Sequence, residues 1–185
     1  MNKNYFIFQV ALLFVCSLVS ATPILDGSKT ITLTGKDNES VDIGFIHFHN
    51  ENDRVTYEIE FEEGVFSDEF LSMRPFKCIH KSGQMICHLV YPYKKQGYIR
   101  EQDLVDLEYD LLFLHKGVDE YGINPWNGLY YDLKAGEDGL VGILKEVDLN
   151  VLAAPPEAGV LRPVTEDMLY DSEPEKHLFP GLTIK

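Results

Sequence analysis

The chain has 185 residues, of which 30 are acidic and 16 are basic, so its formal net charge is −14. This acidity argues against nucleic acid and anionic membranes as partners, because both bind cationic protein surfaces. The length is sufficient for one sizeable core and short for two.

Residues 1–21 have the pattern of a secretory signal peptide. Residues 1–4 form a short basic start, residues 5–19 are almost wholly apolar, and small side chains precede a cleavage point after Ala21. The apolar run is short for a membrane anchor. We therefore expect a secreted or periplasmic mature protein that is soluble, has no membrane span and lacks Cys16. That leaves two cysteines in an oxidising compartment.

Those cysteines, Cys78 and Cys87, are placed symmetrically about Ser82 and Gly83. A two-residue hairpin loop at Ser82 and Gly83 puts Cys78 opposite Cys87, and glycine accepts the positive φ that such a loop needs. The pair falls at a non-hydrogen-bonded position, where cross-strand Cα atoms are closest and within reach of a disulfide. We expect this disulfide to staple the fold; the alternative is two unpaired buried thiols.

The segment 22–150 has the patterning of a β domain. Polar and apolar side chains alternate over residues 30–34, 41–49 and 54–62, which predicts three strands. The last of these is the clearest, because one face is apolar and the other carries glutamates. A hairpin is expected from residues 129–133 and 140–149.

Residues 100–115 fit both a helix and a strand. Leucines recur at the spacing of one helix face, at Leu104, Leu107, Leu111 and Leu114. Apolar residues also alternate from Leu107 to Phe113, as they would in a strand. We expect a helical turn over residues 101–106, followed by a strand over residues 107–115.

Prolines interrupt residues 151–185, and proline cannot sustain a ladder of hydrogen bonds. We expect this Pro-rich C-terminal tail, with a short helix that begins near Thr165, to pack on the β domain of residues 22–150. The whole pattern predicts a mainly β fold, an antiparallel β-barrel or sandwich of about seven to eight strands with one or two short helices.

His47 and His49 are the candidates for a metal site. Residues two apart in a strand share a face, so both imidazoles could approach one ion. A loop at residues 51–52 puts the pair on the polar side, whereas a three-residue loop puts it inside, because a one-residue change of register exchanges the faces. No third ligand completes a recognisable set, so we expect neither a metal nor another cofactor.

The loop of residues 121–131 contains the single tryptophan of the chain, Trp126. Aromatic rings with a polar handle make good ligand platforms, and loops at the end of a β body commonly carry sites. Tyr121, Tyr130 and Asn124 could add contacts to a ligand there. Alternatively, Trp126 closes one end of the core.

Arg74 precedes a proline just before the cysteine hairpin. Its guanidinium could hold a carboxylate or sulfate through two hydrogen bonds. Alternatively, it pairs with one of the many acidic side chains of the chain itself.

Three segments, Met73–Cys78, Asp106–Phe113 and Trp126–Tyr131, resemble those of uncharacterised exported proteins from Gram-negative bacteria. The resemblance covers most of the mature chain. It implies a location in the periplasm or outside the cell. It carries no assigned activity and therefore no site residues.

Local catalytic signatures are missing from the sequence. It has no Gly-x-Ser-x-Gly elbow, no His-Glu-x-x-His motif, no phosphate-binding Gly-Lys-Ser/Thr loop and no dinucleotide fingerprint. We therefore expect an exported, non-catalytic β domain that binds a small ligand or a protein partner through the loop of residues 121–131, with Arg74 nearby. The alternatives are a secreted hydrolase whose site is assembled only in the fold, and an envelope or inhibitor-type interaction protein.

Overall fold

The computed structural model describes residues 24–36, 39–52 and 54–185. The expected signal peptide of residues 1–21 lies outside this part of the chain. No helix within the described ranges is long and apolar enough to cross a membrane.

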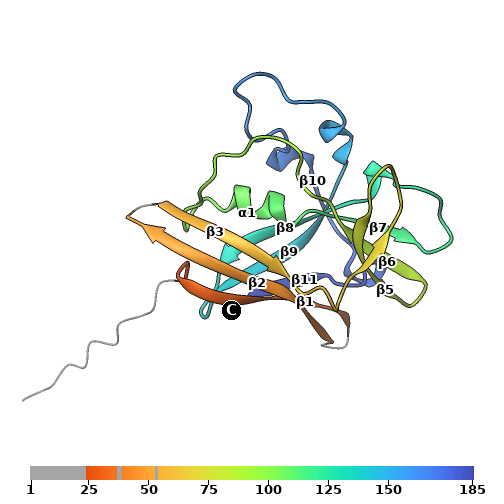
Figure 1. Ribbon diagram of the computed structural model, residues 1–185, viewed down its shortest axis with the longest axis horizontal. Coiled ribbons are helices and arrows are strands. Elements are labelled where there is room, and N and C mark those ends of the chain that lie inside the picture. The colour runs from red at the N-terminus through yellow and green to blue at the C-terminus, as the bar shows by residue number, and fades with distance from the viewer. Residues whose placement is uncertain (1–23, 37–38, 53) are drawn as a thin grey trace, which may run out of the picture.

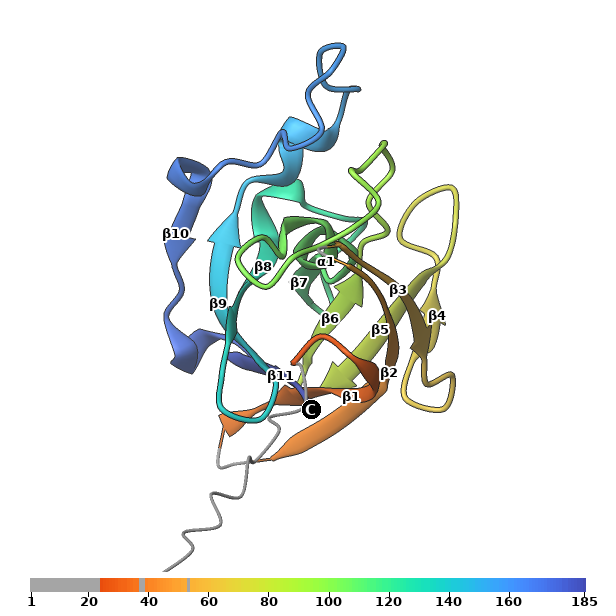
Figure 2. The same ribbon diagram turned by 90° about the vertical axis from the view of Figure 1, so that its left-hand side faces the viewer.

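The fold is one antiparallel sheet of eleven strands that curls strongly into a half-barrel (Figures 1 and 2). Along the sheet the strands follow the order β3-β2-β1-β11-β9-β8-β7-β6-β5-β4, and β10 also pairs with β9. Their bounds are β1 Gly27–Thr34, β2 Ser40–Glu51, β3 Arg54–Phe61, β4 Ser67–Glu69, β5 Phe76–Lys81, β6 Gln84–His88, β7 Phe113–Gly117, β8 Gly128–Ala135, β9 Leu140–Val147, β10 Leu169–Asp171 and β11 Gly181–Ile184. The mainly β, antiparallel prediction is confirmed, but the chain forms a single curled sheet with more strands than predicted.

The additional strands are short or lie in the tail. Strands β4 and β10 have three residues each, too few for alternation to be visible in the sequence. The Pro-rich tail was expected to pack on the β domain, with prolines interrupting any ladder. It also supplies a strand of the sheet, because β11 pairs with β1 on one side and with β9 on the other. Pro180 stands directly before this strand, where its missing N–H breaks no ladder.

The cysteine hairpin is confirmed in register and in chemistry. Ser82 and Gly83 form the loop with φ of 50° and 77°, and Cys78 is the partner of Cys87. Their Cα atoms are 4.0 Å apart, and the two sulfurs form a disulfide. Both cysteines are fully buried.

The prediction for residues 100–115 was wrong in its boundaries. The helix α1 (Val105–Asp110) begins later than expected, and strand β7 begins only at Phe113. The helical spacing prevails because it brings Leu104, Leu107 and Leu111 together in the core on the concave side of the sheet. In Figure 2, α1 lies within the ring of strands.

Two apolar clusters hold the fold together. The larger fills the concave side, and its members include Ile31, Ile46, Leu107, Phe113 and Leu182. The second contains the disulfide and several aromatic rings, and its members include Phe76, Cys87, Tyr109, Tyr130 and Val164. Helix α1 contributes to both clusters, so it stands between the sheet and the tail.

The two edges of the sheet, β3 and β4, are consecutive in the chain, and contacts between distant strands close the curl. The ring of Phe61 on β3 lies 4.6 Å from the ring of His88 on β6. The free edge of β3 is partly covered, because Val55 and Ile99 exchange backbone hydrogen bonds of 3.0 and 2.8 Å.

Candidate functional site

A cleft of about 810 Å³ lies beside the N-terminal end of α1. Its walls come from α1 and the residues before it, from strands β8 and β9, and from the tail segment 162–169. We call it the α1–tail cleft. Three parts of the chain that are distant in sequence therefore meet in one concave surface, which is where small-molecule sites usually occur.

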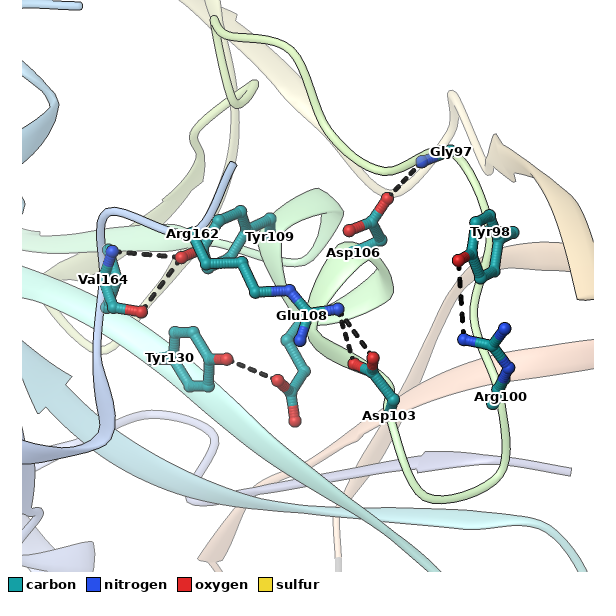
Figure 3. A network of polar contacts seen from close by, with 10 residues as sticks. All are labelled: Gly97, Tyr98, Arg100, Asp103, Asp106, Glu108, Tyr109, Tyr130, Arg162 and Val164. Atoms are coloured by element: carbon teal, nitrogen blue, oxygen red, sulfur yellow. Dashed lines mark hydrogen bonds and ion pairs between the residues drawn. The ribbon is translucent and has the colours of Figure 1, made fainter. Parts of the chain in front are cut away.

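Glu108 is one of the residues that line the cleft, although only 5% of it is exposed. One oxygen accepts a hydrogen bond from the hydroxyl of Tyr130 (Figure 3). The other oxygen accepts a 2.8 Å hydrogen bond from the backbone N–H of Leu133. Both donors are on β8, so Glu108 fastens α1 to the sheet. Burial nevertheless raises the pKa of Glu108, because these two bonds favour the carboxylate less than desolvation disfavours it.

Tyr130 faces the same interior position from β8 and is 4% exposed. Burial, reinforced by the adjacent charge of Glu108, raises the pKa of its hydroxyl well above the usual range. The phenol therefore stays protonated and acts as a donor at any physiological pH. The ring of Tyr109 meets it edge-on, with centroids 6.4 Å apart.

The tail is held over α1 by two side chains. Arg162 Nη2 lies 2.7 Å from both carboxylate oxygens of Asp103. The hydroxyl of Tyr109 donates to the backbone oxygen of Val164 and accepts from its N–H, each at 3.0 Å (Figure 3). Burial raises the pKa of Tyr109 to about 12, so this hydroxyl keeps its proton. The tail wall of the cleft thus depends on both contacts.

The basic side chains that line the cleft are all paired. Besides Arg162, they are Lys134, which lies 3.0 Å from Asp132, and Lys145, which lies 2.6 Å from Asp171. Chemically, the lining of the cleft offers hydrogen-bond acceptors, and it includes one buried acid, Glu108. It suits a small polar ligand that carries hydrogen-bond donors.

Of the residues expected to bind a ligand, the structure places only Tyr130 in the cleft. Trp126 is 69% exposed in a 3-10 turn, so the alternative in which it closes the core was wrong. Asn124 stabilises that turn by accepting a 3.2 Å hydrogen bond from the N–H of Trp126. Tyr121 is fully exposed.

Arg74 is also exposed, on the segment between β4 and β5. Within the described residues no ion pair to it is found, so the expected pairing with an acid of the chain does not appear. The four exposed residues remain candidates for contact with a partner, but none of them lines the cleft to which Tyr130 belongs.

His47 and His49 lie on the polar face of β2. The register of β2 with β3 is neither of the two that the sequence suggested. Glu51 pairs with Arg54, which puts His47 opposite Glu58 and His49 opposite Thr56. His47 Nδ1 is 2.7 Å from the hydroxyl of Ser28. Across residues 24–36, 39–52 and 54–185, no group of three or more His, Cys, Asp or Glu side chains could hold a metal ion.

Glu108, Asp103 and Arg162 were missed by reasoning from the sequence. One feature of the sequence pointed to Glu108. It lies four residues after Leu104, so in a helix it is next to the apolar face that becomes buried. Nothing local pointed to Arg162, because its partner Asp103 is 59 positions away.

Comparison with protein-family models, with curated proteins and with solved structures finds no match to this chain. Its function therefore has to be argued from the site alone. The fold and the cleft define a disulfide-stapled half-barrel with a polar cleft beside the short helix α1.

Proposed function

We propose that this protein is an exported, non-catalytic binding domain whose ligand is a small polar molecule held in the α1–tail cleft. One observation carries the proposal: Glu108, a buried acid held by Tyr130, lines a cleft of about 810 Å³. A concave site with a few fixed polar groups is the usual form of a small-molecule site.

Export is part of the proposal and has two supports. The first 21 residues have the composition of a signal peptide. The described part of the chain contains a disulfide between Cys78 and Cys87, and disulfides form and persist in oxidising compartments.

The cleft is a better ligand site than the aromatic loop that the sequence favoured. A small ligand gains affinity by being surrounded, and the loop presents Trp126 and Tyr121 outward to solvent. Such exposed aromatic side chains suit contact with a protein instead. We therefore assign the small ligand to the cleft.

The test is a thermal-shift and NMR screen of a library of small polar metabolites against the purified protein. We expect a ligand that binds the wild type and binds Glu108→Gln and Tyr130→Phe more weakly, with Trp126→Ala unchanged. Binding lost in Trp126→Ala and kept in Glu108→Gln would move the site to the loop. A library without any hit would remove the small-ligand proposal.

Hydrolysis is the second candidate, favoured by one observation. The cleft contains two groups with displaced pKa values, Glu108 and Tyr130, and a carboxylic acid of raised pKa can act as a general acid. It ranks second because both oxygens of Glu108 already accept hydrogen bonds. Turnover of chromogenic glycosides or esters that disappears in Glu108→Gln would reverse this ranking.

A further inference from the structure

We propose that the ligand of the α1–tail cleft is a small organic cation, an ammonium or guanidinium group on a short aliphatic stem, whose charge lies against Glu108. This inference rests on the proposed function, since it names the chemical class of ligand for the same cleft.

The charge of the cleft is not balanced by its own residues. Each of its three basic side chains has a carboxylate partner, in the pairs Arg162–Asp103, Lys134–Asp132 and Lys145–Asp171. Among the described residues, no ion pair is found for three carboxyl groups that line the cleft, those of Glu101, Glu108 and Glu166. The surplus is negative, so the cleft attracts cations and repels anions.

The position of Glu108, rather than the number of acids, defines where the cation lies. Its two donors, the hydroxyl of Tyr130 and the N–H of Leu133, are neutral groups. They satisfy one lone pair on each oxygen and leave the second free, because a carboxylate has about four acceptor positions. Neutral donors do not cancel the charge that appears when the buried group ionises, whereas a bound cation does.

The walls of the cleft explain why the cation is organic. Aliphatic side chains line it beside the acids, and the larger ones are Leu104, Val105, Leu133, Val164 and Leu169. A short aliphatic stem buries apolar surface against them, which a metal ion cannot do.

Binding is coupled to the ionisation of Glu108. Burial raises the pKa of Glu108, so the carboxyl group keeps its proton to higher pH than an exposed glutamate and must release it to pair with a cation. Affinity therefore rises with pH up to the raised pKa, by up to about tenfold per pH unit. The other charged or titratable groups that line the cleft or pack against Glu108 are Glu101, Asp103, Tyr109, Tyr130, Asp132, Lys134, Lys145, Arg162 and Glu166.

The experiment measures binding of four probes to the purified protein by calorimetry and by NMR shifts of cleft residues, at a series of pH values. Cadaverine and agmatine are the cations, pentanediol is the neutral probe and glutarate is the anionic probe. The variants are Glu108→Gln and the matched control Glu173→Gln, which removes an equal charge from an exposed ion pair with Lys176 outside the cleft.

We expect at least one cation to bind the wild type and the control alike, and to bind Glu108→Gln about tenfold or more weakly. Pentanediol and glutarate should bind more weakly than the cation. Equal binding to wild type and Glu108→Gln, or preference for the neutral or anionic probe, would overturn the proposal that the ligand is a cation. The proposal that the cleft binds a small ligand would be unaffected. Failure of every probe would also overturn the proposal of a cation, and the metabolite screen then decides separately whether the cleft binds any ligand.

Discussion

One guanidinium nitrogen of Arg162, Nη2, lies 2.7 Å from each carboxylate oxygen of Asp103. This pair joins the tail to the residues that lead into α1. The second attachment is the hydroxyl of Tyr109, bonded to both backbone groups of Val164. The tail wall of the cleft is therefore a docked segment whose attachment can be weakened without touching the sheet.

Substitution of Arg162 by alanine should loosen this segment while the sheet stays folded. The pair is partly exposed, with 37% of the Arg162 side chain accessible, so solvent screening limits its contribution to about 1 kcal/mol. We expect the amide of Val164 to exchange its hydrogen about fivefold faster, with exchange in β8 unchanged. Lys176→Ala, which breaks an exposed pair in the same tail, is the control and should leave Val164 unaffected.

Removal of the disulfide should lower stability throughout the molecule. The bond closes a short loop between fully buried cysteines, and the chain-entropy estimate for such a loop is about 2–3 kcal/mol. The double substitution Cys78→Ala and Cys87→Ala should therefore lower the free energy of unfolding in urea by about that amount. A midpoint equal to that of the wild type would show that the hairpin needs no staple.

The hairpin was predictable from the sequence, whereas the cleft was not. The hairpin depends on residues that are close together in the sequence, and the cleft depends on residues that are far apart. The pairing of Cys78 with Cys87 follows from a two-residue loop and counting along two strands. The register of β2 with β3 depended in the same way on one turn, but the sequence there allowed several loops. The pair His47 and His49 accordingly came out in a register that was not considered.

The cleft depends on contacts that leave no local pattern. Glu108 meets Tyr130 across 22 positions, and Arg162 meets Asp103 across 59. Tyr130 was assigned to the aromatic loop because it is close to Trp126 in sequence. The alternation of β8 instead turns its side chain inward and away from that loop. Similarly, β11 could not be predicted from its own residues, because its partners β1 and β9 are both distant from it in the sequence.

The ionisation of Glu108 should leave a signature in the pH dependence of stability. Its pKa in the folded protein is raised above the ordinary value of 4.5, so the folded state holds the proton over a range where the unfolded state has lost it. The stability that the folded protein gains by binding this proton is therefore fully present below pH 4.5. It is lost as the pH rises through the raised pKa of Glu108. Glu108→Gln should flatten this part of the profile, measured as free energies of unfolding in urea, and Glu173→Gln should not. Parallel profiles for wild type and Glu108→Gln would contradict the raised pKa.

His88 should act in the opposite direction at acidic pH. Burial lowers its pKa below the ordinary value of 6.5. Its Nε2 lies 2.8 Å from the backbone oxygen of Asp110, and its ring lies against the ring of Phe61 at an interplanar angle of 53°. The unfolded state gains a proton first as the pH falls, so this contribution is present above pH 6.5 and is lost below it, with a slope of up to about 1.4 kcal/mol per pH unit. In the same denaturation series, His88→Gln should reduce that slope, whereas His49→Gln on the exposed face of β2 should retain it.

Gly44 on β2 should tolerate no side chain, because the backbone of β3 approaches it too closely. A Cβ at this position would lie 2.2 Å from the backbone oxygen of Glu60 and 2.9 Å from the Cα of Phe61. Both close contacts are with the backbone of β3, so that strand would have to move away from β2. We expect Gly44→Ala to lower the free energy of unfolding by about 2 kcal/mol or more. Gly64→Ala is the matched control, because its Cβ would meet only the flexible end of Glu62, at 3.6 Å. Equal urea midpoints for the two variants would mean that β3 does not lie against Gly44 as closely as the structure shows.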